Sequence, residues 1–160
     1  MPRKRKRLLV LFGNQLFSSR HIAQAQPDAI FMAESDSMCR RYRAHQHKLV
    51  LVLSAMRSKA DALRKAGHSL FYEKLEDSAQ KSFESMLREH LSRRSYEEII
   101  YFETESFRMD STVERLGNEH GVEPRRLRSP MFLTSPEEIE TFRSHSGFYS
   151  YGFFVVRPAP

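Results

Sequence analysis

The chain has 160 residues, 40 % of them hydrophobic, and a formal net charge of +6. This length suits one domain, and no apolar run approaches the roughly 20 residues of a membrane span. A single cysteine, Cys39, excludes an internal disulfide, and no secretory signal is recognisable, so we predict a cytoplasmic protein.

Much of the positive charge lies near the N-terminus, where residues 3–7 are all Arg or Lys. Basic segments favour anionic partners such as DNA or RNA, although a short one is more often a solvated arm. We therefore predict that residues 1–6 form a basic arm, with DNA contact as an open alternative.

Five apolar runs along the chain predict β-strands. Four of them cover residues 7–13, 28–35, 68–75 and 97–105. A weaker fifth run covers 121–129, and Pro124 restricts it to the edge of a sheet. Continuous apolar runs are typical of parallel strands that helices cover on both faces.

Apolar stripes at helical spacing predict four helices. The longest lies in the segment 47–68, where Gly67 follows it as a C-terminal cap; its stripe consists of Leu49, Leu53, Met56, Ala60 and Leu63. The others cover 78–95, 107–121 and 134–145, and Ser135 and Pro136 give the last one a start signal. The alternation of strands and helices predicts a Rossmann-like three-layer α/β/α fold.

Ligands of such folds bind at the carboxyl ends of the strands. The first strand ends in Gly13, Asn14 and Gln15, but no glycine-rich dinucleotide fingerprint, P-loop or nucleophile elbow is present. Carboxylates follow two further strands at positions that we expect to be neighbours; they are Glu34, Asp36, Glu103 and Glu105. They would bind a ligand or a cation, or remain solvated charges.

Three polar residues around the start of the long helix lie three positions apart in the sequence. Tyr42, His45 and Lys48 would share one helix face, which could overhang Asn14 and Gln15. A phenol, an imidazole and two carboxamides can stack on and hydrogen-bond a flat heteroaromatic ring, although such a pattern is more often a hydrated helix face.

Several motifs in order give the chain a family resemblance. They are the turn Gly13-Asn14-Gln15-Leu16, the Y-x-x-H-x-x-K segment from Tyr42 to Lys48, "LSAMR" (53–57) and "AGH" (66–68). Over residues 7–145 the sequence resembles the N-terminal α/β domain of the photolyase-related branch of the cryptochrome/photolyase family. Full-length members of this bacterial branch carry an iron–sulfur cluster and repair (6-4) photoproducts.

The resemblance implies a parallel five-stranded sheet of order 3-2-1-4-5 and an antenna function. In the family, this domain holds a ribityllumazine chromophore and passes excitation energy to FAD in a separate helical domain. The cofactor-binding residues that it implies are Gly13, Asn14, Gln15, Leu16, Glu34, Tyr42, His45 and Lys48. We add Glu103, which lies at a strand end that could also face the chromophore. We expect no catalytic or metal-binding residue in this chain.

The chain also departs from the family pattern. Asn14 stands where an aspartate is common, and the sequence expected for the FAD-binding helical domain and the cluster cysteines is missing. We therefore expect an antenna domain without FAD or an iron–sulfur cluster, which is not catalytic alone and which pairs with an FAD domain in its parent protein.

The last residues, 146–160, form an aromatic tail that differs from the family. An exposed apolar run of this kind favours association, so we expect it to fold back on the sheet or to form a homodimer contact. Two alternative functions stay open at this point: a small nucleotide- or phosphate-binding α/β enzyme that uses Lys48 and His45, and a non-catalytic module that dimerises through the tail.

Overall fold

The computed structural model of the chain describes residues 6–41, 45–77, 81–135 and 137–141. The chain forms two compact units, Met1–Ser129 and Pro130–Pro160. The strands of the first unit are β1 (Arg7–Val10), β2 (Ala29–Ala33), β3 (Leu70–Glu73), β4 (Glu98–Phe102) and β5 (Glu123–Leu127). Its helices are α1 (Ser19–Ala25), α2 (Asp36–Arg41), α3 (Gln46–Lys65), α4 (Phe83–Arg93) and α5 (Phe107–Glu119).

The five strands form one parallel sheet in the order β3-β2-β1-β4-β5, which confirms the predicted fold and strand order. β1 lies at the centre, where Leu9 is in register with Ile30 of β2 and Ile100 of β4. Pro124 lies in β5, the last strand in this order, which pairs with β4 and is an edge strand among the described residues.

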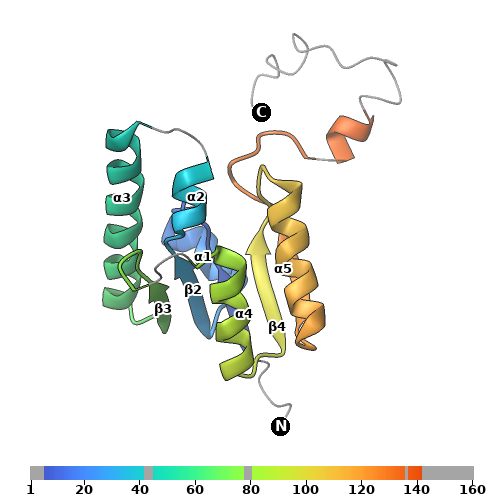
Figure 1. Cartoon of the computed structure of the whole chain (residues 1–160). Helices are drawn as coiled ribbons and strands as arrows, with labels where there is room; N and C mark the ends of the chain where they lie inside the picture. Colours follow the sequence, from blue (N-terminus) through green and yellow to red (C-terminus); the bar gives the residue numbers. More distant parts are fainter. Residues whose placement is uncertain (1–5, 42–44, 78–80, 136, 142–160) are drawn as a thin grey trace. The chain divides into compact units, whose positions relative to one another are not determined.

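Helices cover the sheet on both faces (Figure 1). Alternate residues of each central strand point to opposite faces, so Leu8 and Val10 pack with α4 and α5, while Leu9 packs with α1 and α3. This double burial explains why the central strands read as continuous apolar runs.

Two helices were missing from the sequence prediction. Parallel neighbours such as β1 and β2 need a crossover, and α1 provides it in seven residues. Only Ile22 and Ala25 of α1 are buried, so its apolar stripe was too short to stand out. The six-residue α2 was missed as well.

Glycines terminate the helices where the sequence predicted. Gly67 follows α3 with a φ of 85°, and Gly121 follows α5 with a φ of 67°, a backbone conformation that glycine adopts without strain.

In the second unit, the Ser135 hydroxyl accepts a hydrogen bond from the backbone N–H of Glu138, whose carboxylate accepts the N–H of Ser135. This capping box begins a helical segment over 137–141.

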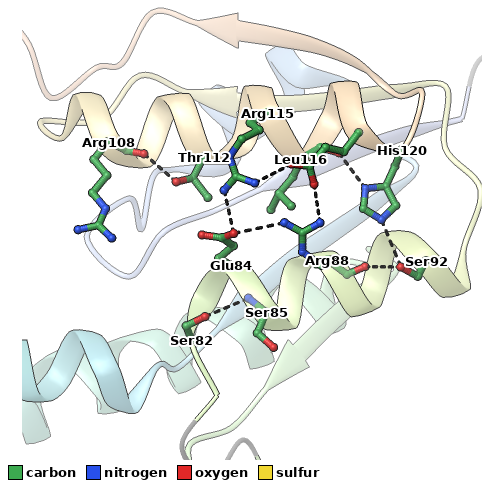
Figure 2. A network of polar contacts seen from close by, with 11 residues as sticks. Ser82, Glu84, Ser85, Arg88, Ser92, Arg108, Thr112, Arg115, Leu116 and His120 are labelled. Atoms are coloured by element: carbon green, nitrogen blue, oxygen red, sulfur yellow. Dashed lines mark hydrogen bonds and ion pairs between the residues drawn. The ribbon is translucent and has the colours of Figure 1, made fainter.

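A closed ring of ion pairs joins α4 to α5 (Figure 2). Arg115 contacts Glu84 at 2.8 Å and Glu119 at 2.7 Å, and Arg88 contacts the same two carboxylates from the other helix. The four side chains are partly exposed, so we expect the ring to fix the pairing of the two helices more than to add stability.

Gly117 lets α5 approach the sheet closely. A Cβ atom at this position would lie 2.9 Å from both the Ile99 side chain and the Val122 backbone oxygen. Replacing Gly117 by alanine should therefore lower the free energy of unfolding by about 2 kcal/mol, because α5 must move off β4. Urea denaturation measures the effect; the neighbouring exposed control Asn118→Ala should change it by less than about 0.5 kcal/mol. Equal effects of the two substitutions would contradict the packing argument.

No helix among the described residues is long and apolar enough to cross a membrane. Most of the predicted basic arm and the whole of the aromatic tail, 146–160, lie outside the described residues. The DNA contact and the tail-mediated homodimer therefore stay predictions.

Candidate functional site

The strand order reverses between β1 and β4. The chain runs from β1 outward to β2 and β3, then returns to the other side of β1 with β4 and β5. Open parallel sheets bind their ligands at the carboxyl ends of the strands that flank such a reversal. In this protein, those ends are the loop after β1, residues 11–18, and the segment that follows Phe102.

Gln15 bridges the two strand ends. Its Nε2 donates hydrogen bonds to the backbone oxygens of Phe102 and Glu103, each at 3.0 Å. The side chain is fully buried, and its Oε1 accepts no hydrogen bond from the residues that the structure describes. Because a buried acceptor without a donor costs about 1–3 kcal/mol, this atom would be stabilised by a bound N–H or O–H group.

The rest of the loop is fixed against α3. A side chain at Gly13 would lie 2.8 Å from the sulfur of Met56, so the close approach that this glycine allows is to α3. Leu16 packs on the α1–α3 core, and the backbone oxygen of Phe17 accepts a hydrogen bond from Lys59 Nζ at 2.6 Å. Burial lowers the pKa of Lys59. The loop is thus held from two sides, by β4 and by α3.

Two carboxylates lie at the end of β4. Asn14 Nδ2 lies 2.9 Å from each carboxylate oxygen of Glu105, and both side chains are exposed. Glu103 is half-buried, and its Oε1 accepts the backbone N–H of Ser129 at 3.2 Å. Asn14, Gln15 and Glu103 therefore lie at the switch point, and their assignment to a ligand stays a prediction.

Glu34 at the end of β2 is held by the protein itself. Arg57 binds both of its oxygens at 2.8 Å, and Tyr72 Oη and the Leu75 backbone N–H donate to them at 2.5 and 2.9 Å. Burial alone would raise the pKa of this carboxyl, but the hydrogen bonds from Arg57, Tyr72 and Leu75 outweigh it and lower the pKa to about 2. Glu34 is thus an anionic anchor that joins β2, β3 and α3.

The expectation that the strand-end carboxylates are neighbours is wrong. Glu34 follows β2 and Glu103 follows β4, and β1 lies between these strands. Asp36 forms an ion pair with Arg40 within α2. Among the described residues, no group of three or more His, Cys, Asp or Glu side chains could hold a metal ion.

The expected face of Tyr42, His45 and Lys48 is only partly described. Tyr42 lies outside the described residues, and His45 does not lie within a helix but caps α3, where its Nδ1 accepts the backbone N–H of His47 at 3.3 Å. Lys48 is exposed in the first turn of α3. The assignment of these three residues to a ligand stays a prediction.

The chain matches the family described as deoxyribodipyrimidine photo-lyase-related protein over residues 9–154. It belongs to this photolyase-related family. The match supports the family as a whole rather than its iron–sulfur branch. A search of curated proteins gives no match.

In this photolyase-related chain, sequence reasoning missed several supporting residues. Arg57 and Tyr72 hold Glu34, and Lys59 holds the loop after β1. Arg57 had one signal, its place in the "LSAMR" motif, whereas Tyr72 lies in a run that predicts only a strand. Lys59 had no signal, because it reads as a solvated residue of a long helix.

Proposed function

We propose that this photolyase-related chain is an antenna-type domain that binds a planar heteroaromatic chromophore at the carboxyl ends of β1 and β4. The observation that carries the proposal is the buried Oε1 of Gln15, which lies at the switch point and accepts no hydrogen bond from the described residues. A heterocycle with a ring N–H would supply the missing donor.

A ribityllumazine-type chromophore fits these residues. Gln15 and Asn14 would bind its polar edge, and Leu16 would contribute apolar contact. Glu103 lies at the same strand end, whereas Glu34 lies at the end of β2 and is held by Arg57 and Tyr72. The chromophore, when bound, would absorb near-ultraviolet and blue light and transfer the excitation energy.

The wider function is part of the same proposal. Repair of DNA needs an electron donor, which we assign to an FAD-binding helical domain of the parent protein. The present chain would serve that domain in blue-light-driven repair in the cytoplasm and would not be catalytic alone.

Replacing Gln15 by alanine should weaken chromophore binding at least tenfold, by about 1.4 kcal/mol or more, because the acceptor at the switch point is lost. Titration of the purified chain with a ribityllumazine, followed by fluorescence, measures the affinity. We expect Tyr42→Ala to weaken binding as well.

The matched control is Gln24→Ala, which removes an exposed amide from α1. Circular dichroism checks that each variant is folded; should Gln15→Ala unfold, the exposed Asn14→Ala replaces it. Binding that is equal in wild-type protein and in both loop variants would refute the proposed site. Absorbance of the purified protein between about 350 and 450 nm would reveal a chromophore retained from the cell.

A further inference from the structure

The side-chain amide donors of the loop after β1 are used within the chain. Both N–H groups of the Gln15 amide are directed at backbone oxygens at the end of β4, those of Phe102 and Glu103. The amide nitrogen of Asn14 is directed at both oxygens of Glu105. These bonds fix the orientation of the two amides, because a flip would place oxygen against oxygen.

The groups that remain at this edge are acceptors. Gln15 Oε1 is buried, and neither it nor Asn14 Oδ1 accepts a hydrogen bond from any described residue. A ligand that reaches these amide oxygens must therefore donate hydrogen bonds to them. This is the reverse of a dinucleotide site, where backbone N–H groups of a helix N-terminus receive a phosphate.

The charged side chains at this edge also bear on which ligand can bind. The carboxylates of Glu103 and Glu105 form no ion pair within the described part of the chain; they accept hydrogen bonds from the neutral donors Ser129 N–H and Asn14 Nδ2. At the start of α5, Asp110 accepts the backbone N–H and the hydroxyl of Thr104 and also pairs with Arg126, whose Nη1 lies 4.0 Å from its Oδ2. The carboxylates of Glu103 and Glu105 are thus the negative charges at this edge that would repel a phosphate.

We propose that this edge selects an uncharged, donor-bearing heterocycle and discriminates against the phosphorylated form of the same ring, with Glu105 as the discriminating residue. The inference rests on the proposed function and adds to it the ligand specificity of the site. The ring N–H of the ligand would donate a hydrogen bond to Gln15 Oε1. If the ribityl chain of the ligand extends past Asn14, a phosphate at the end of that chain would lie near the exposed Glu105 carboxylate.

Riboflavin and flavin mononucleotide test the proposal, because they share one ring and differ only in the phosphate. We expect flavin mononucleotide to bind about tenfold more weakly than riboflavin at low salt, and the ratio to fall toward one in 1 M salt. Glu105→Gln keeps a side-chain oxygen for Asn14 but removes the charge, so it should narrow the ratio to about threefold or less by strengthening the binding of flavin mononucleotide.

The matched control is Glu97→Gln. Glu97 is exposed and directly precedes the first residue of β4, at the end of the strand that lies away from the site, so its replacement should leave the ratio of the two flavin affinities unchanged. Methylation of the flavin at N3 should also weaken binding about tenfold, because it removes the ring N–H. Equal affinities for the two flavins, or a ratio that Glu105→Gln does not alter, would overturn the inference while leaving the proposed function standing. Failure of the wild-type chain to bind either flavin or a ribityllumazine would overturn the proposed function, and the inference with it.

Discussion

Replacing Glu34 by glutamine should lower the free energy of unfolding by about 3 kcal/mol at pH 7, with a fall in Tm of roughly 10 °C. The buried carboxylate accepts two hydrogen bonds from Arg57 and one each from Tyr72 and Leu75. A glutamine offers one oxygen to these four donors and points its own N–H groups at the others. Urea denaturation at pH 7 measures the loss.

The control for Glu34→Gln is Glu89→Gln, which neutralises a carboxylate in ion pairs with Lys81 and Arg93 on the outside of α4. This pairing is largely solvated, so the control should change stability little. Equal losses in the two variants would contradict the role of Glu34 as an anchor.

The pH dependence of the Glu34 effect follows from its pKa, which the Arg57, Tyr72 and Leu75 hydrogen bonds hold at about 2 in the folded chain, against an ordinary value of 4.5. A carboxyl whose pKa is lowered by folding stabilises the fold at pH values above its pKa in the unfolded chain. This stabilisation is lost as the pH falls from 4.5 toward 2. The stability difference between wild type and Glu34→Gln should therefore shrink over this range. A constant difference between pH 5 and pH 3 would show that the charge of Glu34 does not matter.

The sheet was predictable because its central strands are buried on both faces. Continuous apolar runs such as that of β1 predict parallel strands directly, and glycines such as Gly67 give the ends of the helices. The strand order came from the family resemblance, since the apolar runs do not specify which strands are neighbours. α1 escaped prediction because only two of its residues face the core.

The site was predictable only in part, because its key contacts join residues that are distant in the sequence. The motif named Gln15 and Asn14, yet their partners at Phe102 and Glu105 are 87 and 91 residues away. Sequence patterns report which face of an element is apolar, but they do not report which polar atoms meet. For this reason, the separation of Glu34 from Glu103 by β1 became clear only from the sheet.

Acidification from pH 7.5 to pH 5 should lower the free energy of unfolding by about 2 kcal/mol through His90 alone. His90 of α4 is 8 % exposed, its ring lies 5.0 Å from the Phe31 ring and 4.7 Å from the Phe71 ring, and its Nε2 lies 2.9 Å from Tyr96 Oη. Burial, together with the charges of the nearby Arg94 and Lys6, lowers the pKa of His90 from 6.5 to about 4.

The sign of the His90 effect follows from proton binding. Below pH 6.5 the unfolded chain takes up a proton at this histidine, whereas the folded chain does so only near pH 4, so stability falls as the pH drops through this interval. The measured range of pH 5–7.5 lies above the Glu34 range of pH 4.5 to 2, so the two effects separate. Burial raises the pKa of Asp110, so the effect of this carboxyl on stability has the opposite sign.

Urea denaturation across pH 5–7.5 measures the slope, and His90→Gln should flatten it because glutamine does not titrate. This variant should also be less stable at pH 7.5, since glutamine fills the space between the two phenylalanine rings poorly; the slope, and not the absolute stability, carries the test. His47→Gln, at an exposed position in the first turn of α3, is the matched control and should keep the wild-type slope. A slope that survives in His90→Gln, or that disappears in His47→Gln, would assign the acid sensitivity to another histidine. The pKa of His90 would then be the same in the folded and the unfolded chain, and the imidazole would contribute to stability through its packing only.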